Sequence, residues 1–512
     1  MAGHLTPRQA KGPEKAHNDM KEATLVCSER NWKVLRSHLL QSDKMERAAF
    51  LLLGRAEVRG EIEYYVHRFI PVPDEKCDQQ HGTVVEPAPL FVLNTYASYA
   101  QSATVALVHA HSHPFCEHAS FSGVDDAYLS STVRDFVNYL KTADADRPHI
   151  FMRLVTGQSE GGFTGEVFDA TARKIENISS IRVIGVSGVQ TICQFGRAAA
   201  DEPGVVPADE RLRLDRNLRW LGDAGQASIA KTRLAICGLG GVGAEVLKIC
   251  RGLGFKHYTL VDMDTVEIHN LNRLIWGKDD VGRLKTAVAR DFIRAVDVNA
   301  EVCVISKPVG DVEAQEALLN ADFIINAFDN DNARLDVQSL AARHMKPLLD
   351  LGSGITLKPD TRQVAGMGGQ VSFYIPGEAC LACQGLDTSA IMTAEHREVR
   401  RSLGYVEGTD ETPASVVTIN SVIAAIAGDI AMKFITGFSG VPKWIRYDML
   451  QHKTIEMQFA RRRTCPICGE DGIEGLGSGC VKPLPPPVCH GEDSFFERGK
   501  SATIPPFGTR VD

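Results

Sequence analysis

The stretch LAICGLGGVGAEVLKICRGLGFKHYTLVDMD, residues 234–264, decides the fold of the C-terminal half of the chain. It has the pattern of an apolar strand, a glycine-rich loop, a helix and a second strand that ends in Asp262. The loop glycines are Gly238, Gly240, Gly241 and Gly243. Glycines in such a loop let the backbone approach a phosphate group at the N-terminus of the helix, and the acidic residue can bind ribose hydroxyls. The stretch therefore predicts a Rossmann-like α/β domain, although the loop alone is shared by every dinucleotide-binding domain of this kind.

Polar residues after this stretch favour a nucleoside triphosphate over a nicotinamide cofactor. Asn270 and Arg273 lie in VDMDTVEIHNLNR. Lys285 follows in VGRLK, and Asp329 lies in INAFDN. Two cations and a second carboxylate suit a triphosphate with magnesium, because charge on the α-phosphate must be neutralised during attack. A solvated surface position explains any one of these residues but not the whole set.

Two pairs of cysteines predict a structural zinc site. Cys380 and Cys383 lie in EACLACQG, and Cys465 and Cys468 lie in RTCPICG. Four thiolates in two such pairs close a tetrahedral zinc site and leave no position for water. A redox-active pair or buried free cysteines are the alternatives, and both explain less of the pattern. The total of 13 cysteines, an odd number, also favours metal binding and free thiols over a disulfide framework.

These motifs closely resemble the MoeB/ThiF adenylating family, the fold from which ubiquitin-activating enzymes are built, over residues 216–468. The resemblance implies that Asp262 binds the ATP ribose and that Arg273 and Lys285 bind phosphates. It also implies that Asp329 handles magnesium. The full set that the resemblance assigns to ATP is Gly238, Gly240, Gly241, Gly243, Asp262, Asp264, Asn270, Arg273, Lys285 and Asp329.

The same resemblance implies a homodimer. Arg216, in LDRNLRWLGDAGQ, matches the arginine that this family inserts into the ATP site of the partner subunit. The family also keeps a structural zinc at a four-cysteine site of this kind. The catalytic residues expected in this half are Arg216, Arg273, Lys285 and Asp329.

The loop ahead of the last long helix departs from the ubiquitin-activating relatives. It reads GYVEGTDETPASVVTINSVIAAIAGD, residues 404–429, without the cysteine that usually accepts the adenylated C-terminus. The chain either stops at the acyl adenylate, which a partner's thiol attacks, or carries an acceptor elsewhere. Candidate acceptors are Cys480, Cys489, Thr409, Thr412 and Ser415. Hydroxyls are weaker nucleophiles than thiolates, so the first interpretation ranks highest, and Thr412, beside two acidic residues, is a possible oxyester acceptor.

A second constellation lies in VHAHSHPFCEHASFSGVD, residues 108–125. His111 and His113, two residues apart at the end of a strand, can meet one metal ion, and Asp125 from the next helix supplies a third ligand. The fourth position stays open for a water molecule, which predicts a hydrolytic zinc site. Ser122 and Asp125 also form a helix-capping box, which by itself explains these two residues without a metal.

This stretch resembles the JAB/JAMM metalloprotease family, whose members cleave isopeptide or peptide bonds at the C-terminus of ubiquitin-like proteins. The resemblance implies a cytidine-deaminase-like α/β domain and a glutamate general base ahead of an apolar strand. Glu46 precedes AAFLLLG, with one residue more before the glycine than the family generally shows, and Glu61 and Glu63 are the alternatives. Such a base polarises the water and passes its proton to the leaving amine, while Ser122 hydrogen-bonds the developing oxyanion.

Composition limits the class of protein. The chain has 512 residues, 44% apolar and 23% charged residues and a formal charge of −8, which predict a soluble protein of two or three domains without a general nucleic-acid footprint. We find no apolar run of membrane-spanning length and no signal-peptide core, so a cytoplasmic protein without a membrane or nucleic-acid partner is expected.

The predicted organisation has five parts. They are a disordered N-terminus (1–20), the JAB/JAMM domain (21–196), a linker (197–210), the ThiF/MoeB adenylation domain with its zinc knuckle (211–470) and a Pro/Gly-rich, extended or mobile tail (471–512).

The leading functional hypothesis is a bifunctional enzyme of a prokaryotic ubiquitin-like conjugation pathway. One half trims or releases the modifier and the other adenylates its C-terminus, using two zinc ions, ATP and magnesium. A ubiquitin-like protein and a separate conjugating-enzyme-like protein are the expected partners. The alternative is a sulfur-carrier pathway, in which a small ubiquitin-fold protein is trimmed, adenylated and given sulfur. An inactive scaffold would need none of these chemical groups.

Overall fold

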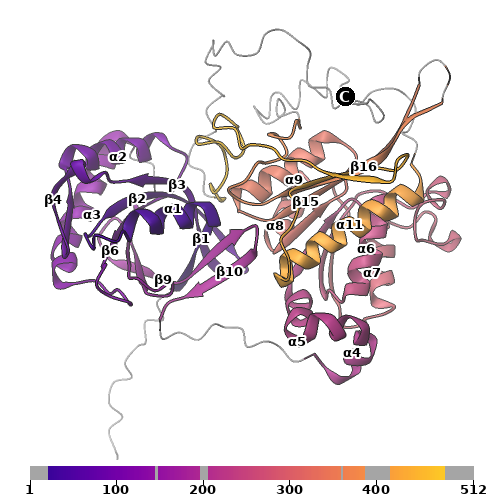
Figure 1. The fold of residues 1–512 in the computed structure, drawn as a ribbon, viewed down its shortest axis with the longest axis horizontal. Helices are drawn as coiled ribbons and strands as arrows, with labels where there is room; N and C mark the ends of the chain where they lie inside the picture. Colours follow the sequence, from indigo (N-terminus) through magenta and orange to yellow (C-terminus); the bar gives the residue numbers. More distant parts are fainter. Residues whose placement is uncertain are drawn as a thin grey trace, which may run out of the picture.

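The computed structural model describes residues 21–144, 148–195, 206–358, 361, 363–386 and 415–478. Over these residues the chain forms two halves, each built around an eight-stranded sheet (Figure 1). The N-terminus predicted to be disordered and most of the predicted linker lie outside the described residues.

The N-terminal half is a closed sheet with helices on both sides. Its strands are β1 (Lys21–Ser28), β2 (Ala48–Val58), β3 (Glu61–Pro71), β4 (Cys77–His81), β5 (Val84–Pro87), β6 (Ala106–Ser112), β7 (Ile150–Thr156), β8 (Phe163–Phe168), β9 (Lys174–Gly185) and β10 (Gly188–Cys193). Its helices are α1 (Glu29–Leu39), the short 3-10 helix η1 (Asp74–Lys76), α2 (Pro89–Gln101) and α3 (Gly123–Ala143). The strand order is β1-β3-β2-β6-β7-β8-β9-β10, and β1 also pairs with β9.

Strand β2 explains why an apolar run without alternation forms the centre of this sheet. Leu51 and Leu53 pack in one core with Trp32 of α1. Phe50 and Leu52 point to the other face and pack in a second core with residues of α2 and α3. A strand covered on both faces reads as a continuous apolar run, as AAFLLLG does.

The C-terminal half is a Rossmann-like sheet extended by antiparallel strands. Its strands are β11 (Arg233–Cys237), β12 (His257–Val261), β13 (Glu301–Ile305), β14 (Phe323–Asn326), β15 (Leu348–Leu357), β16 (Val364–Tyr374), β17 (Trp444–Asp448) and β18 (Lys453–Glu456). Its helices are α4 (Ala208–Arg213), α5 (Asp215–Lys231), α6 (Gly241–Leu253), η2 (Ile268–Asn270), η3 (Lys278–Asp280), α7 (Lys285–Arg294), α8 (Val312–Leu319), α9 (Asp331–Arg343) and α11 (Val417–Thr436). In the order β13-β12-β11-β14-β15-β16-β17-β18, the first five strands are parallel and the last three are antiparallel. Helix α4 begins inside the predicted linker.

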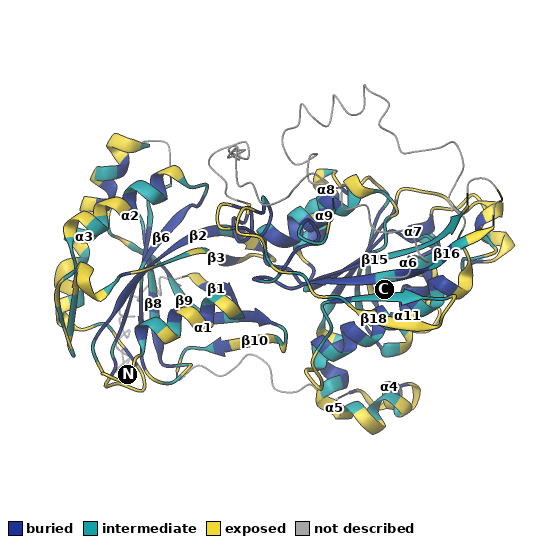
Figure 2. Cartoon of the chain, turned by 45° about the horizontal axis from the view of Figure 1, so that its top comes forward, coloured by how far each residue is buried: buried dark blue, intermediate teal, exposed yellow. Residues whose placement is uncertain are grey.

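Helix α11 is the central helix of this half. It packs against α6, β15 and β16. Its length and apolar composition would also suit a membrane span, but 56% of its most apolar 18-residue stretch is buried inside the protein. Figure 2 shows that in both halves the strands are largely buried, whereas α3, α4 and α5 have exposed outer faces.

The stretch after Cys468 differs from the prediction. Residues 471–478, assigned from the sequence to an extended or mobile tail, are largely buried and pack between the two halves. Arg55 of β2 forms a parallel bridge with Gly477 of this stretch. Side chains from both halves also share one apolar core, in which Val26 and Tyr65 join Ile430 and Phe434.

Candidate functional sites

The first site lies at the end of β6 in the N-terminal half. His111 Nε2 lies 3.2 Å from Asp125 Oδ1, and His113 Nε2 lies 3.8 Å from Asp125 Oδ2. A tetrahedral zinc ion with nitrogen and oxygen ligands at about 2.0–2.1 Å places those ligand atoms about 3.3 Å apart. Both ring nitrogens of His111 are buried without a hydrogen-bond partner among the described residues, apart from this approach of Asp125. The donor set and its spacing therefore fit the predicted metal ion.

The start of α3 holds Asp125 in place. Ser122 donates from its backbone N–H at 2.6 Å and from its hydroxyl at 2.8 Å to Asp125 Oδ2, and Asp125 N–H donates back to Ser122 Oγ. The capping box expected as the ordinary alternative is therefore present, and it leaves Oδ1 directed at His111. Burial raises the pKa of Asp125, but hydrogen bonds from His111 and Ser122 hold it well below its usual range. Asp125 can therefore take part in the capping box and face the histidines as a metal ligand in the same geometry.

Glu46 lies beside this cluster. Ala48 of β2 pairs with His111 of β6, so Glu46, two residues before β2, comes next to the histidines. Glu46 Oε1 lies 3.8 Å from His113 Nε2, and Glu46 is only 6% exposed. Burial, and then the nearby charge of Asp125, raise the pKa of Glu46 to about 7. A carboxyl group with such a pKa suits proton exchange near neutral pH.

The two alternative glutamates do not belong to this site. Glu61 begins β3, and Glu63 pairs with Ala56 near the opposite end of β2. The carboxylate of Glu63 binds Arg182 at 2.5 Å and accepts a hydrogen bond from Tyr65 at 2.6 Å. The structure therefore brings Glu46 alone of the three candidates to the histidines.

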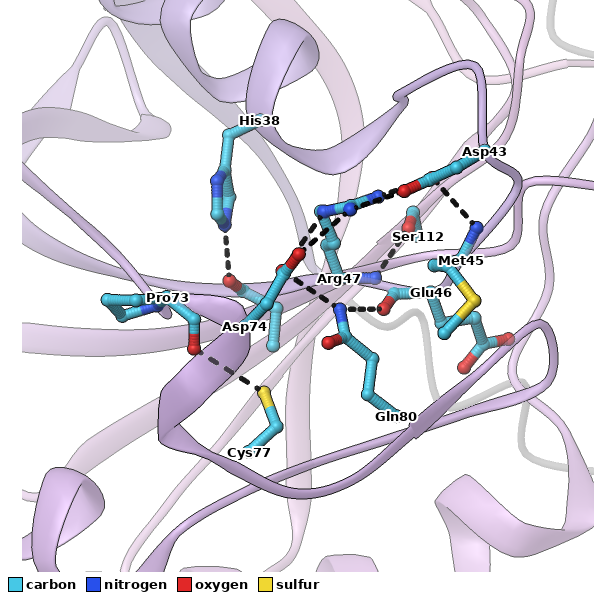
Figure 3. Close-up of polar contacts among 11 residues, drawn as sticks. His38, Asp43, Met45, Glu46, Arg47, Pro73, Asp74, Cys77, Gln80 and Ser112 are labelled. Atoms are coloured by element: carbon cyan, nitrogen blue, oxygen red, sulfur yellow. Dashed lines mark hydrogen bonds and ion pairs between the residues drawn. The ribbon is translucent and has the colours of Figure 1, made fainter.

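A buried arginine next to Glu46 was not predicted from the sequence. The guanidinium of Arg47 donates to both carboxylate oxygens of Asp43 at 2.7 Å and to Asp74 at 3.0 and 3.2 Å (Figure 3). Its backbone N–H donates to Ser112 Oγ, next to His111 on β6, and Gln80 donates to the Glu46 carbonyl. Figure 3 shows the Glu46 carboxylate pointing away from this network. The network therefore fixes the backbone of Glu46 while its carboxylate faces the histidines.

The second site lies at the carboxyl ends of β11 and β12. Gly238 has a φ of +84°, and a side chain there would strike the backbone of Ala327. Asp262 is buried and accepts hydrogen bonds from the N–H of Leu239 at 2.6 Å and of Asp264 at 2.9 Å. Burial raises the pKa of Asp262, and the nearby Lys285 partly offsets that effect.

Lys285 and Arg273 add positive charge near the glycine loop. Lys285 Nζ lies 2.8 Å from Asp264 Oδ2 and 4.0 Å from Asp262 Oδ2. Arg273 passes Gly241 at the first turn of α6, and its guanidinium donates to the His269 carbonyl at 3.0 Å. Helix α6 begins without a side-chain cap, so its first N–H groups are available to an anion.

Asn420 of α11 lies against the glycine loop and was not predicted from the sequence. It is 1% exposed, and its amide nitrogen packs against Gly241, where a Cβ would overlap it. Ser353 donates to Asn420 Oδ1 at 2.8 Å, and Asn420 Nδ2 donates to Ser415 Oγ at 3.2 Å. Its position in an apolar helix was the signal available in the sequence, because a buried amide needs partners that an apolar core does not supply.

The remaining predicted residues of this half occupy different places. Asn270 is buried in η2, and Asp329 is exposed just after β14. Arg334 of α9 pairs with the buried Asp350, a pair not predicted from the sequence.

Arg216 lies on α5 with 87% of its side chain exposed, so within one chain it belongs to the surface. The candidate acceptors outside the described residues are Thr409, Thr412, Cys480 and Cys489.

A small hollow lies beside Arg334 on the sheet face formed by β16 and β17. Ser372 of β16 pairs with Trp444 of β17 there, and both line the hollow together with Gln384. The indole N–H of Trp444 and the amide oxygen of Gln384 are buried without a hydrogen-bond partner among the described residues.

The four cysteines meet between β16 and the last described segment. Cys380 Sγ lies 3.5 Å from Cys465 Sγ, and Cys383 Sγ lies 3.6 Å from Cys468 Sγ. All four sulfurs lie within 4.8 Å of one another. Zinc–sulfur distances of about 2.3 Å place tetrahedral ligands about 3.8 Å apart, so the cluster fits a zinc ion. The predicted gathering of these cysteines is confirmed.

The glycine loop, the buried acidic strand end and the ion-paired lysine at one edge of a parallel sheet define a nucleotide-binding α/β domain. Residues 214–468 match the ThiF family. The C-terminal half of the chain therefore belongs to this family.

Several known proteins are similar to this half. Molybdopterin-synthase adenylyltransferase of Escherichia coli is 26% identical over 269 residues, which cover 51% of this chain and 97% of that protein. SAMP-activating enzyme E1 of Haloferax volcanii is 24% identical over 272 residues, which cover 52% of this chain and 92% of that protein. A crystal structure of E. coli MccB is 22% identical, covers 52% of this chain and 74% of that chain, and has a TM-score of 0.42.

Proposed function

We propose that the C-terminal half adenylates the C-terminal carboxylate of a small ubiquitin-fold protein with ATP. The observation that carries the proposal is the convergence of Asp262, Lys285 and the uncapped start of α6 in a ThiF-family domain. The similarity to molybdopterin-synthase adenylyltransferase and to a SAMP-activating enzyme supports the same reaction class.

In this proposal each residue of the nucleotide site has a separate role. Asp262 binds the ribose hydroxyls, and Lys285, Arg273 and the first N–H groups of α6 hold the phosphates. The substrate carboxylate attacks the α-phosphorus, the bond to the β-phosphate oxygen breaks, and pyrophosphate leaves. The positive charges stabilise the negative charge that develops on the α-phosphate. Asp329 would hold magnesium, which neutralises the departing pyrophosphate.

We also propose that the N-terminal half is a JAB/JAMM-type metallopeptidase acting on the same class of protein. His111, His113 and Asp125 would hold zinc, which would supply Lewis-acid activation of a water molecule. Glu46 accepts a proton and delivers it to the leaving amine. Ser122 holds Asp125 through two hydrogen bonds, so its hydroxyl serves the metal ligand before it can serve an oxyanion.

The assembly and pathway complete the proposal. A homodimer would place the exposed Arg216 of one chain in the ATP site of the other. A conjugating-enzyme-like protein would receive the activated carboxyl group, and the pathway would operate in the cytoplasm. Ser415, held by Asn420 at the glycine loop, and Thr412 remain alternatives to a partner's thiol as the acceptor.

A sulfur-carrier pathway is the second candidate, and the similarity to molybdopterin-synthase adenylyltransferase over 97% of that protein favours it. The two candidate pathways differ in the reaction that consumes the acyl adenylate. Sulfide or a sulfurtransferase would convert the carboxylate to a thiocarboxylate, whereas conjugation would link it to an amine.

One experiment tests the adenylation proposal directly. The full chain is incubated with candidate ubiquitin-fold proteins, ATP and magnesium, and the products are read by intact-protein mass spectrometry. Acyl adenylate or a covalent adduct is the expected result, and ATP/pyrophosphate exchange should depend on the carrier protein. Exchange without any ubiquitin-fold protein, or no exchange with any tested ubiquitin-fold protein, would contradict the proposal.

The same mass measurement tests the peptidase proposal when the carrier has residues added after its processed C-terminus. Loss of that extension, dependent on added zinc and blocked by a chelator, is the expected result. Cleavage by the chelated protein would contradict a metal-dependent mechanism.

A further inference from the structure

The segment that comes after the second cysteine pair lies between the two halves of the chain. We name residues 469–478 the connecting segment; part of it was predicted to be a mobile tail. It leaves the four-cysteine site, passes the end of α9 and reaches the edge formed by β2 and β3 (Figure 1). It therefore touches a predicted metal site and both halves within ten residues.

Backbone carbonyls of the loop Cys465–Cys468 hold the first part of this segment in place. Gly469 N–H donates to the Cys465 carbonyl at 2.9 Å. Ile473 N–H donates to the Pro466 carbonyl at 3.2 Å, and Glu474 N–H donates to the Ile467 carbonyl at 2.9 Å. These acceptors all lie within the loop Cys465–Cys468, so the position of the segment depends on the shape of that loop.

The second part of the segment binds the N-terminal half through its backbone. Gly54 N–H of β2 donates to the Gly475 carbonyl at 3.2 Å, and Ser478 N–H donates to the Arg55 carbonyl at 3.0 Å. The ring of His67 on β3 bonds to the Glu474 carbonyl at 2.7 Å. A side chain at Gly54 would overlap the backbone of the connecting segment. Glycine is thus required at this contact.

Glu474 anchors the middle of the segment in the C-terminal half. Its buried carboxylate accepts hydrogen bonds from Tyr374 at 2.8 Å and from the N–H of Gly377 at 3.2 Å, and it pairs with Arg461 at 3.3 Å. Gly475 and Gly477 then donate to carbonyls at the end of α9. The segment is therefore fixed on the C-terminal half before it meets β2.

We propose that metal binding at the four-cysteine site controls the docking of β2 on the connecting segment. With the metal bound, the loop Cys465–Cys468 presents its carbonyls to the connecting segment, which aligns the backbone groups that β2 needs. Without it, four sulfurs within 4.8 Å of one another lose the cation that holds them together, and the template for the segment is lost. The proposal rests on the four-cysteine site and not on either proposed activity.

Hydrogen–deuterium exchange on the full chain tests this. Exchange of peptides that contain Gly54 and Arg55 is compared in the zinc-loaded protein, the chelated protein and a Cys465→Ser/Cys468→Ser variant. Loss of docking exposes the Gly54 amide, so exchange should be at least about tenfold faster in the two metal-free samples. A His111→Ala/His113→Ala variant, which removes only the other metal site, should match the wild type.

Two further measurements distinguish loss of docking from unfolding of the C-terminal half. Nucleotide binding, measured by calorimetry, should persist in the metal-free samples if the C-terminal half is still folded. Gly54→Val, which blocks the contact directly, should separate β2 from the connecting segment while both metal ions stay bound. Unchanged exchange at Gly54 after zinc loss would overturn the proposal, as would unchanged docking in Gly54→Val or loss of nucleotide binding together with docking.

Discussion

Glu46 and Glu63 show how one residue type acquires opposite properties within a single domain. Burial and the charge of Asp125 raise the pKa of Glu46 to about 7. Burial also raises the pKa of Glu63, but the charges of Arg182 and Lys346 more than offset it and bring that pKa down to about 2. Glu46 can therefore exchange protons near neutral pH, whereas Glu63 stays ionised and serves the contact between the halves.

Asp125 is the residue whose loss should remove the metal from the N-terminal half. In Asp125→Asn a neutral amide replaces the anionic ligand, so zinc measured by mass spectrometry should fall from about two ions to about one per chain. Peptidase activity should disappear while ATP/pyrophosphate exchange stays unchanged. The matched control is Asp126→Asn, which alters only the neighbouring carboxylate that pairs with Arg153. Full zinc content in Asp125→Asn would show that this carboxylate is not a ligand.

Lys285 should be needed for adenylation but not for proteolysis. Lys285→Ala removes a buried cation near Asp262 and should lower ATP/pyrophosphate exchange at least about 100-fold. Lys278→Ala, on the exposed helix η3 a few residues earlier, is the control and should keep wild-type exchange. An equal effect of the two substitutions would mean that surface charge, rather than a phosphate contact, accounts for the loss.

The sequence predicted the residues whose type and spacing are restricted by metal or nucleotide binding. It missed the residues whose role depends on how distant segments pack together. Paired histidines, cysteine pairs and the glycine loop have spacings that few other structures require, and the structure gathers each set. Arg47 and Asn420 carry no such spacing, because besides the nearby Asp43 and Ser415 their partners come from η1, β6 and β15, which are distant in the chain. Glu63 was an alternative base because the sequence does not show which end of β2 a glutamate of β3 will face.

At the scale of elements, the first turn of α3 joins helix capping to metal binding. In Ser122→Ala, Asp125 loses the hydroxyl partner that orients it and α3 loses its N-cap. We expect zinc affinity to fall about 10- to 100-fold. We also expect a stability loss of about 1 kcal/mol. Zinc titration with a competing chelator and urea unfolding measure the two effects. Ser131→Ala, on the same helix, is the control, and equal zinc affinities in the two variants would contradict the role given to Ser122.

At the scale of the whole molecule, a buried charged cluster lies where the halves meet. Lys346 of the C-terminal half is buried near Glu63 of β3, and burial lowers the pKa of Lys346 to about 8 despite that carboxylate. Arg59 of the N-terminal half pairs with Asp322 of the other at 3.2 Å. The contact between the halves is thus partly ionic as well as apolar.

Glu63 should make stability depend on acid pH. Its pKa is about 2 in the folded protein against an ordinary 4.5, so its contribution is complete above pH 4.5 and is lost as pH falls towards 2. One pKa unit corresponds to about 1.4 kcal/mol, so Glu63 alone should cost about 2 kcal/mol between pH 5 and pH 3. Glu63→Gln should lose less stability over that range than Glu61→Gln, an exposed position on the same strand. Equal losses in urea unfolding would contradict this assignment.

The Rossmann-like fold of one half followed from apolar runs and the glycine loop, and the resemblance to the JAB/JAMM family implied an α/β fold for the other. The structure has strands and helices in both halves. Neither line of reasoning predicted how the halves associate. The glycine-rich residues 471–478 were assigned to a mobile tail because their burial comes from distant parts of the chain: β2 and β3, more than 400 positions earlier, and Tyr374 and the end of α9. Local pattern cannot report a contact of that sequence separation.

The course of β2 sets how far the two proposed activities lie from each other. The strand meets the histidine cluster at Ala48 and the other half at Arg55, so about 23 Å of rigid backbone separates the cluster from the seam. Under the proposed function, a substrate tail shorter than that distance would not reach from the histidine cluster into the other half while its folded body stays in place. Each substrate protein would then be released between trimming and activation, and its free concentration would set the balance between the two reactions.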